Sequence, residues 1–176
     1  MKHEKNNAKM LELLVALVTI PKNLIHIHGL ENMTEFLLHN LSQKECFNFS
    51  KVAYFVDNAD FGMLKGVAGF KDNEAYQPDR SHWHEQDAFS NHMKKSDFNK
   101  KVRDYCKYSI KKNGDSPDHI VQELGQVLEF KQPHYMLWPI KYENQGLLLF
   151  EAHDVDKELK EHLENSLHLF GFCPVF

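Results

Sequence analysis

Apolar side chains at helical spacing form one face of the first predicted element. Its members are Met10, Leu13, Leu14, Leu17 and Val18. Pro21 is expected to end or kink this helix, because proline lacks the backbone N–H that the next turn requires. A second helical pattern covers residues 30–41, with Glu35 and His39 on its other faces. The sequence therefore predicts two helices before any strand.

The pattern then changes to that of an antiparallel hairpin. Residues 52–56 are apolar at every position, residues 57–60 are typical of a turn, and residues 63–70 form the expected partner strand. A strand without polar positions is expected to be covered on both faces. A second hairpin is predicted from residues 135–142 and 146–152, which a tight turn connects.

Further helices are predicted between and after the two hairpins. Ser96 is expected to cap one helix over residues 98–110. Ser116 is expected to cap another, and residues 155–170 form the last amphipathic helix. With four strands in this order, the sequence predicts an α+β fold with a central, mainly antiparallel sheet and helices on both faces.

One domain accounts for the whole chain. Its 176 residues match the usual size of a single domain, so the domain covers residues 1–176, with a core over about residues 10–170.

Residues 71–96 show neither helical nor strand periodicity in their apolar positions, and they carry three histidines. A long loop inside a compact domain is often functional. This irregular segment is therefore predicted to act as a lid over the sheet face opposite the terminal helices.

Composition narrows the functional classes. The chain has 21 Lys and Arg against 25 Asp and Glu, a net charge of −4, which argues against nucleic acid as a partner. The apolar run at residues 13–20 is far shorter than the roughly 20 residues that span a bilayer, so no membrane anchor is expected. Cys46, Cys106 and Cys173 are odd in number and widely spaced, which favours a reducing, cytoplasmic environment.

Two pairs of strings resemble a known family. Residues 49–57 (FSKVAYFVD) run into residues 63–70 (MLKGVAGF), and residues 137–141 (LWPIK) precede residues 146–150 (GLLLF). Together with the order of the elements, these strings resemble the GAF domain, a small ligand-sensing module of signalling proteins, and most closely its variant in bacterial signalling. The resemblance implies a GAF-like (PAS-like) architecture with the helices from both chain ends on one sheet face and the middle segment on the other.

The resemblance also implies a ligand pocket between the sheet and residues 71–132. Aromatic side chains with polar tips suit small-molecule recognition. The candidate ligand-binding residues are Tyr54, His82, Trp83, His84, His134 and Trp138. The alternative interpretation makes Tyr54 and Trp138 core residues, as large aromatic strand residues usually are. With ordinary pKa values near 6.5, His82 and His84 would bind an anion more tightly as the pH falls from about 8 to 6, provided that both imidazoles are accessible.

The histidine-rich loop also offers a metal site. His82 and His84, two residues apart on an extended segment, would point the same way, and Asp87 or His92 would complete the ligand set. A histidine-dependent metal-binding protein or metalloenzyme is therefore one alternative function. No catalytic nucleophile stands out, because Cys106 is expected on the buried face of its helix. No cofactor is indicated.

The leading interpretation is a cytoplasmic, non-catalytic sensory or regulatory domain that binds a small molecule or a signalling protein. An interaction module without a small-molecule ligand is a further alternative. A homodimer through residues 10–20 and 155–170 is also expected. Both segments carry apolar arcs, GAF-like domains commonly pair in this way, and the apolar tail at residues 170–176 would otherwise be exposed.

Overall fold

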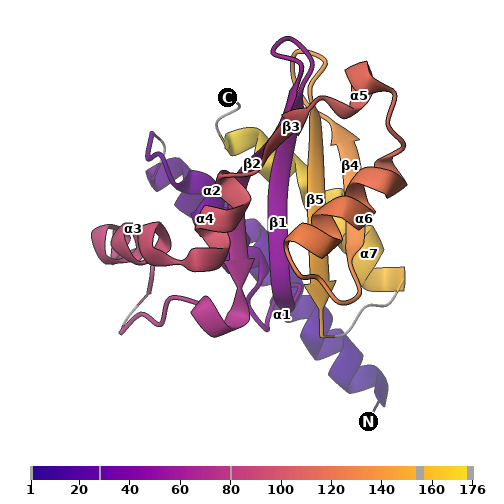
Figure 1. Cartoon of the computed structure of the whole chain (residues 1–176). Helices are drawn as coiled ribbons and strands as arrows, with labels where there is room; N and C mark the ends of the chain where they lie inside the picture. Colours follow the sequence, from indigo (N-terminus) through magenta and orange to yellow (C-terminus); the bar gives the residue numbers. More distant parts are fainter. Residues whose placement is uncertain (1, 28, 80, 154–156, 174–176) are drawn as a thin grey trace.

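A computed structural model describes residues 2–27, 29–79, 81–153 and 157–173. Helices cover both faces of a five-stranded antiparallel sheet (Figure 1). In chain order, the elements are α1 (Lys2–His26), α2 (Met33–Leu41), β1 (Phe49–Asn58), β2 (Met63–Lys71), the 3-10 helix η1 (Asp72–Glu74), α3 (Gln86–Lys95), α4 (Asp97–Arg103), β3 (Cys106–Tyr108), α5 (Ile110–Asn113), α6 (Pro117–Val127), β4 (His134–Pro139), β5 (Gln145–Ala152), α7 (Lys157–Ser166) and η2 (Leu167–Phe172).

The predicted α+β class is confirmed. The strands lie in the order β3-β2-β1-β5-β4, and both predicted hairpins form, with β1 paired to β2 and β4 paired to β5. Strand β1 is central and is covered on both faces, as its apolar run predicted. Tyr54 and Val56 belong to one core cluster, whereas Ala53 and Phe55 belong to the other.

The helices from both chain ends cover one face of the sheet, as the resemblance implied, and part of the middle segment covers the other. Helices α1, α2 and η2 pack on one face, and α4, α5 and α6 pack on the other. However, Trp83, Phe89 and Met93 pack with α1 and α2 rather than on the opposite face. The expected position of residues 71–96 is therefore wrong, because aromatic stacking on Phe36 of α2 holds this segment at the terminal-helix side.

Three expectations about helices need correction. The helix predicted over residues 98–110 is instead α4, β3 and α5, because β3 pairs with β2. Cys106 consequently lies exposed on a strand rather than buried on a helix. Helix α1 continues through Pro21 to His26, so Pro21 does not end the helix, and a kink at this residue stays a prediction. In the last predicted helix, Val155 and the side chain of Leu159 lie outside the described residues.

Two glycines bring α4 into direct contact with β2. A Cβ atom at Gly66 would lie 1.8 Å from the carbonyl oxygen of Val102, and one at Gly69 would lie 2.7 Å from the Val102 side chain. Any larger residue would push the helix away. The side-chain oxygen of Asn99 also accepts the Gly69 N–H at 2.9 Å, so α4 supplies a hydrogen-bond acceptor to the edge of β2 that β3 leaves free.

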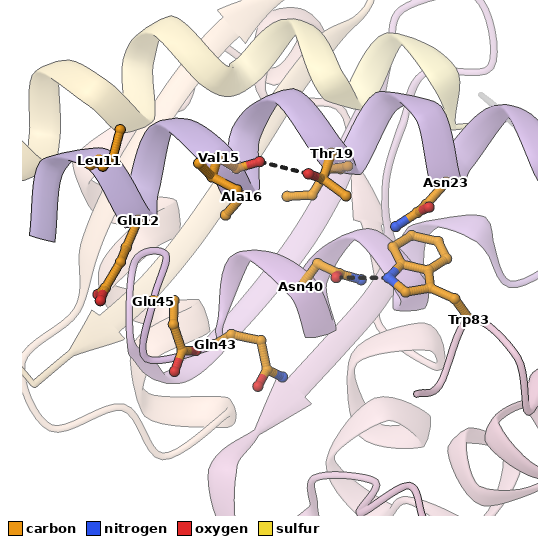
Figure 2. Close-up of a pocket in the computed structure, with 11 residues that line it drawn as sticks. Leu11, Glu12, Val15, Ala16, Thr19, Asn23, Asn40, Gln43, Glu45 and Trp83 are labelled. Atoms are coloured by element: carbon orange, nitrogen blue, oxygen red, sulfur yellow. Dashed lines mark hydrogen bonds between the residues drawn. The ribbon is translucent and has the colours of Figure 1, made fainter. Parts of the chain in front are cut away.

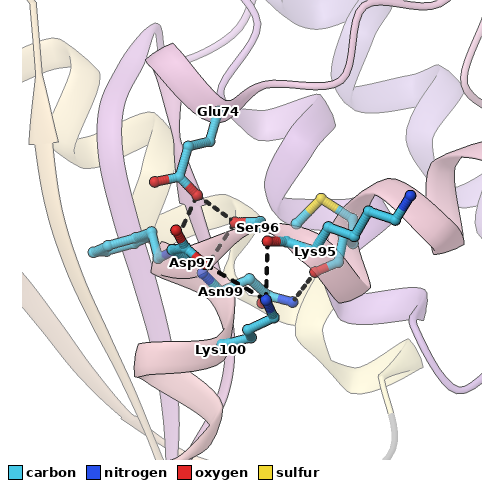
Figure 3. Close-up of polar contacts among 8 residues, drawn as sticks. Glu74, Lys95, Ser96, Asp97, Asn99 and Lys100 are labelled. Carbon is cyan, nitrogen blue, oxygen red and sulfur yellow. Dashed lines mark hydrogen bonds and ion pairs between the residues drawn. The ribbon is translucent and has the colours of Figure 1, made fainter.

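The start of α4 is fixed by a carboxylate from η1 (Figure 3). Glu74 Oε2 accepts hydrogen bonds from Ser96 Oγ at 2.7 Å and from the Phe98 N–H at 3.0 Å. Ser96 Oγ in turn accepts the Asn99 N–H at 3.1 Å, which confirms the predicted capping role of Ser96. These bonds connect the end of β2 to α4.

Candidate ligand-binding cavity

A cavity of about 460 Å³ opens between α2, the end of β2, and residues 75–78 and 81–83. Its wall is mainly polar, and the residues on which the following argument depends are His39, Asn40, Tyr76, His82 and Trp83. Of the six predicted ligand-binding residues, His82 and Trp83 line this cavity. The sequence did not single out His39 or Asn40, which α2 contributes.

Asn40 holds His82 and Trp83 in place. Its Nδ2 donates hydrogen bonds to Nε2 of His82 at 2.7 Å and to the carbonyl oxygen of Phe36 at 2.7 Å. Its Oδ1 accepts the indole N–H of Trp83 at 3.1 Å (Figure 2). Because Nε2 of His82 is an acceptor here, the proton of the neutral imidazole lies on Nδ1. His82 therefore has a hydrogen-bond donor left for another partner.

His39 forms the deepest polar part of the wall. It is 1% exposed, and its Nε2–H donates to the carbonyl oxygen of Tyr76 at 3.2 Å. Among the described residues, no group hydrogen bonds to Nδ1 of His39. The ring lies 5.4 Å from that of His82, centroid to centroid. The wall thus contains two buried imidazoles, and Nδ1 of His39 is an acceptor for which the described residues supply no hydrogen-bond donor.

Burial keeps both imidazoles uncharged at neutral pH. Desolvation lowers the pKa of His39 to about 4 and the pKa of His82 to about 4. His82 therefore does not titrate between pH 8 and 6. The expected tightening of anion binding at this residue over that range is wrong, because the prediction assumed an accessible imidazole.

Aromatic packing anchors the cavity wall to α2. The Phe36 ring stacks on Trp83 at 5.4 Å and on His82 at 5.9 Å, and lies 4.1 Å from the Phe89 ring, centroid to centroid. Tyr76 closes the outer side, where its hydroxyl donates to Glu85 Oε2 at 2.6 Å. The segment predicted to be a lid is thus packed in this structure, and its opening stays a prediction.

The other predicted ligand-binding residues lie outside this cavity. Tyr54 is 2% exposed and stacks on Trp138 at 5.7 Å, which matches the core interpretation of this pair. His134 lies on β4, with its ring 5.7 Å from that of Phe150. His84 is exposed.

The extended segment on which the metal-site alternative depends does not form. Residues 81–85 make a turn, in which the His84 N–H donates to the Ser81 carbonyl oxygen at 2.9 Å. His82 is consequently buried against Asn40, whereas His84 and Asp87 are exposed. His92 Nε2 instead donates to the Glu74 carbonyl oxygen at 2.7 Å. In the described part of the chain, no three His, Cys, Asp or Glu side chains are placed to hold a metal ion.

A second, apolar groove of about 550 Å³ runs along α1 (Figure 2). Residues of α1, among them Leu11, Val15 and Ile20, form one side. The other side is formed by Asn40, Gln43, Glu45 and Trp83. Asn40, Gln43 and Trp83 line both this groove and the polar cavity. The two hollows therefore share a wall.

Comparisons with known proteins do not assign a family. No family model matches the chain, and no significant match exists among curated proteins or solved structures. Within the described ranges, no helix has the length and apolar character needed to cross a membrane.

Proposed function

We propose that this protein is a cytoplasmic, non-catalytic, GAF-like regulatory domain that senses a small uncharged molecule in the cavity beside α2. The supporting observation is the buried pair of His39 and His82 in the cavity wall. The volume of about 460 Å³ falls within the usual range for small-molecule sites. The α+β sheet with helices on both faces is compatible with the GAF resemblance.

The charge distribution in the cavity favours an uncharged ligand. Both imidazoles are neutral at pH 7, so neither would balance a buried anion or cation, and burying an unpaired charge is costly. The lining also contains two charged residues, Lys44, which is exposed, and Asp72, whose side chain is 50% exposed and lies 3.7 Å from His153. The Nδ1–H of His82 suits a carbonyl oxygen. An amide or lactam therefore has the appropriate chemistry.

A lactam fragment tests this proposal. We use 2-pyridone, which is uncharged and carries one N–H and one C=O, and detect binding by saturation-transfer NMR. His82→Phe keeps the stack on Phe36 but removes the donor, and His134→Phe makes the same change outside the cavity. Binding to the wild type and to His134→Phe, with at least about a fivefold loss in His82→Phe, supports the proposal.

Equal binding to His82→Phe, or no binding to the wild type, would contradict the proposed ligand site. Acetate at the same concentration serves as the charged probe, and preferential binding of acetate would contradict an uncharged ligand. If neither probe binds, the interaction module without a small-molecule ligand becomes the better account.

We propose further that the domain acts as a homodimer through α1. Its outward side carries large apolar side chains with exposed fractions of 49–64%: Leu11, Leu14, Val15, Val18 and Ile25. By contrast, Leu163 of α7 and Phe170 of η2 are buried within the chain, so the C-terminal segment is a weaker candidate than the sequence implied. Residues 174–176 of the tail lie outside the described residues.

Light scattering at tens of micromolar protein measures this association. A dimer has twice the chain mass of 20.7 kDa. Val18→Asp is expected to give the monomer, because a carboxylate in the middle of the contact would lose its hydration. A wild-type protein of single-chain mass would contradict the dimer.

A further inference from the structure

Helix α1 is apolar on two opposite sides. Its inward residues Leu13, Ile20 and Leu24 are at most 6% exposed and belong to the core. Its outward residues carry the exposed apolar side chains already described. An exposed apolar patch of this kind commonly marks an interaction surface. The outward side is therefore a candidate surface for a partner.

Three of the five outward residues have a symmetrical spacing. Leu11, Val18 and Ile25 lie seven residues apart, which keeps them on one side of a helix. Val18 is at the middle, and the two outer residues lie about 10 Å from it along the axis on either side. A second copy of the helix that runs in the opposite direction and is centred on Val18 therefore places its Ile25 at the level of Leu11 and its Leu11 at the level of Ile25. Such a surface is complementary to an antiparallel copy of itself.

We infer that two copies of the chain pair through α1 in antiparallel orientation, about a twofold axis close to Val18. Val18 contacts the partner's Val18, and Leu11 packs against the partner's Ile25. This inference rests on the dimer proposed above and adds its geometry. It commits to a second copy as the occupant of the outward side of α1.

Charge complementarity favours the antiparallel over the parallel arrangement. Lys22 is exposed and lies within the apolar stripe, between Val18 and Ile25. A parallel pair would place it beside the partner's Lys22 and would align the two helix dipoles. An antiparallel pair places it opposite the partner's Leu14, close to the partner's exposed Glu12. Lys22 of each copy then lies near Glu12 of the other copy, so each chain supplies one cation and one anion to the interface.

The partner helix would also cover the apolar groove. Leu11 and Val15 belong both to the outward stripe and to the groove beside Trp83. A helix lying on the stripe would form the missing outer wall of that groove. Each copy has five outward apolar side chains that are about half or more exposed. Together the two copies offer on the order of 800 Å² of apolar surface, and the groove adds further surface. Specific interfaces require about 1,000 Å² or more in total.

Cysteine pairing tests the orientation. Leu11→Cys, Val18→Cys and Ile25→Cys are made in a Cys106→Ser background, because Cys106 is exposed whereas Cys46 and Cys173 are buried. The Ile25→Cys chain carries a tag, so that mixed and like pairs differ in mass. Mild oxidation then reports which positions come within disulfide distance.

The antiparallel pair predicts that mixed Leu11→Cys and Ile25→Cys disulfides exceed like pairs by about tenfold, and that Val18→Cys pairs with itself. Predominant like pairs at positions 11 and 25 would contradict the orientation while leaving the dimer intact. Absence of any disulfide at Val18→Cys, together with single-chain mass by light scattering, would contradict both. None of these results depends on the ligand cavity, which the 2-pyridone experiment tests separately.

Discussion

Asn40 Nδ2 lies 2.7 Å from His82 Nε2, and this contact sets the chemistry of the cavity wall. It fixes the His82 proton on Nδ1, the donor that the proposed ligand would use. The same Asn40 side chain holds Trp83, which separates the polar cavity from the groove along α1. One residue of α2 therefore orients the two side chains that the sequence placed in the site.

Asn40→Asp is expected to raise the pKa of His82 well above its present value of about 4. The carboxylate would accept a proton from the imidazole instead of donating to it, which favours the charged form. An NMR titration of the histidine ring signals measures the change. Asn113→Asp makes the same substitution at an exposed position and should leave the pKa of His82 unchanged. An unchanged titration in Asn40→Asp would show that the assigned hydrogen bond does not form.

The stability of the protein is expected to fall as the pH drops from about 6.5 to 4. His39 and His82 have folded pKa values of about 4, against 6.5 when unfolded, so the unfolded state takes up protons first. Each histidine then lowers the free energy of unfolding by up to about 1.4 kcal/mol per pH unit in that window, and their contribution is constant above it.

Urea unfolding at several pH values measures this dependence. His39→Gln and His82→Gln should each give a shallower slope between pH 6 and 4.5, whatever their effect on stability at pH 7. A slope equal to that of the wild type in both variants would show that these histidines are protonated in the folded protein.

The buried carboxylate of Glu35 depends on Arg103. Its side chain is 2% exposed and lies 3.0 Å from the guanidinium, which is 48% exposed. Desolvation raises the pKa of Glu35, and Arg103 opposes that shift. A raised folded pKa means that this group destabilises the fold as the pH rises through it.

Arg103→Met is therefore expected to cost about 1–3 kcal/mol at pH 7 and less at pH 5, because loss of the guanidinium raises the pKa of Glu35 further and makes its protonation easier. Lys101→Met removes an ion pair to Glu129, whose side chain is 76% exposed, and should cost under about 0.5 kcal/mol at either pH. Denaturant unfolding of both variants provides the measurement. An equal cost of Arg103→Met at the two pH values would contradict this explanation.

Gly66→Ala is expected to destabilise the protein by about 2–4 kcal/mol. The added methyl group would collide with the Val102 carbonyl oxygen and force α4 away from β2. Gly171→Ala is the control, because nothing lies within 4 Å of its added Cβ. Thermal unfolding of the two variants should differ clearly. If Gly66→Ala is as stable as Gly171→Ala, the close contact between α4 and β2 is not present in solution.

Local signals explain which parts of the fold could be predicted. The β1–β2 hairpin follows from the apolar run at residues 52–56 and the turn residues after it. Strand β3 could not be found in this way, because it has three residues and depends on pairing with residues 63–65 of β2. Tyr105, Cys106 and Ile110 match a helical period by chance, and the pairing of β3 with β2 overrides it.

The site was only half predictable for a related reason. His82 and Trp83 stood out because an aperiodic segment carried imidazole and indole side chains. His39 and Asn40 lie within a regular helix, whose period shows which residues share a face but not what packs there. The bond between Asn40 and His82 joins residues 42 positions apart, a relationship that no local pattern contains.

The indole N–H signals of the protein test the ligand site most directly. The chain has two tryptophans, Trp83 in the cavity wall and Trp138 on β4, so each spectrum contains its own control. On titration with 2-pyridone to about 20 mM, a concentration suited to so small a fragment, the Trp83 signal should shift and saturate while the Trp138 signal stays in place. A shift of Trp138 alone, or no shift of either signal, would contradict a ligand site beside α2.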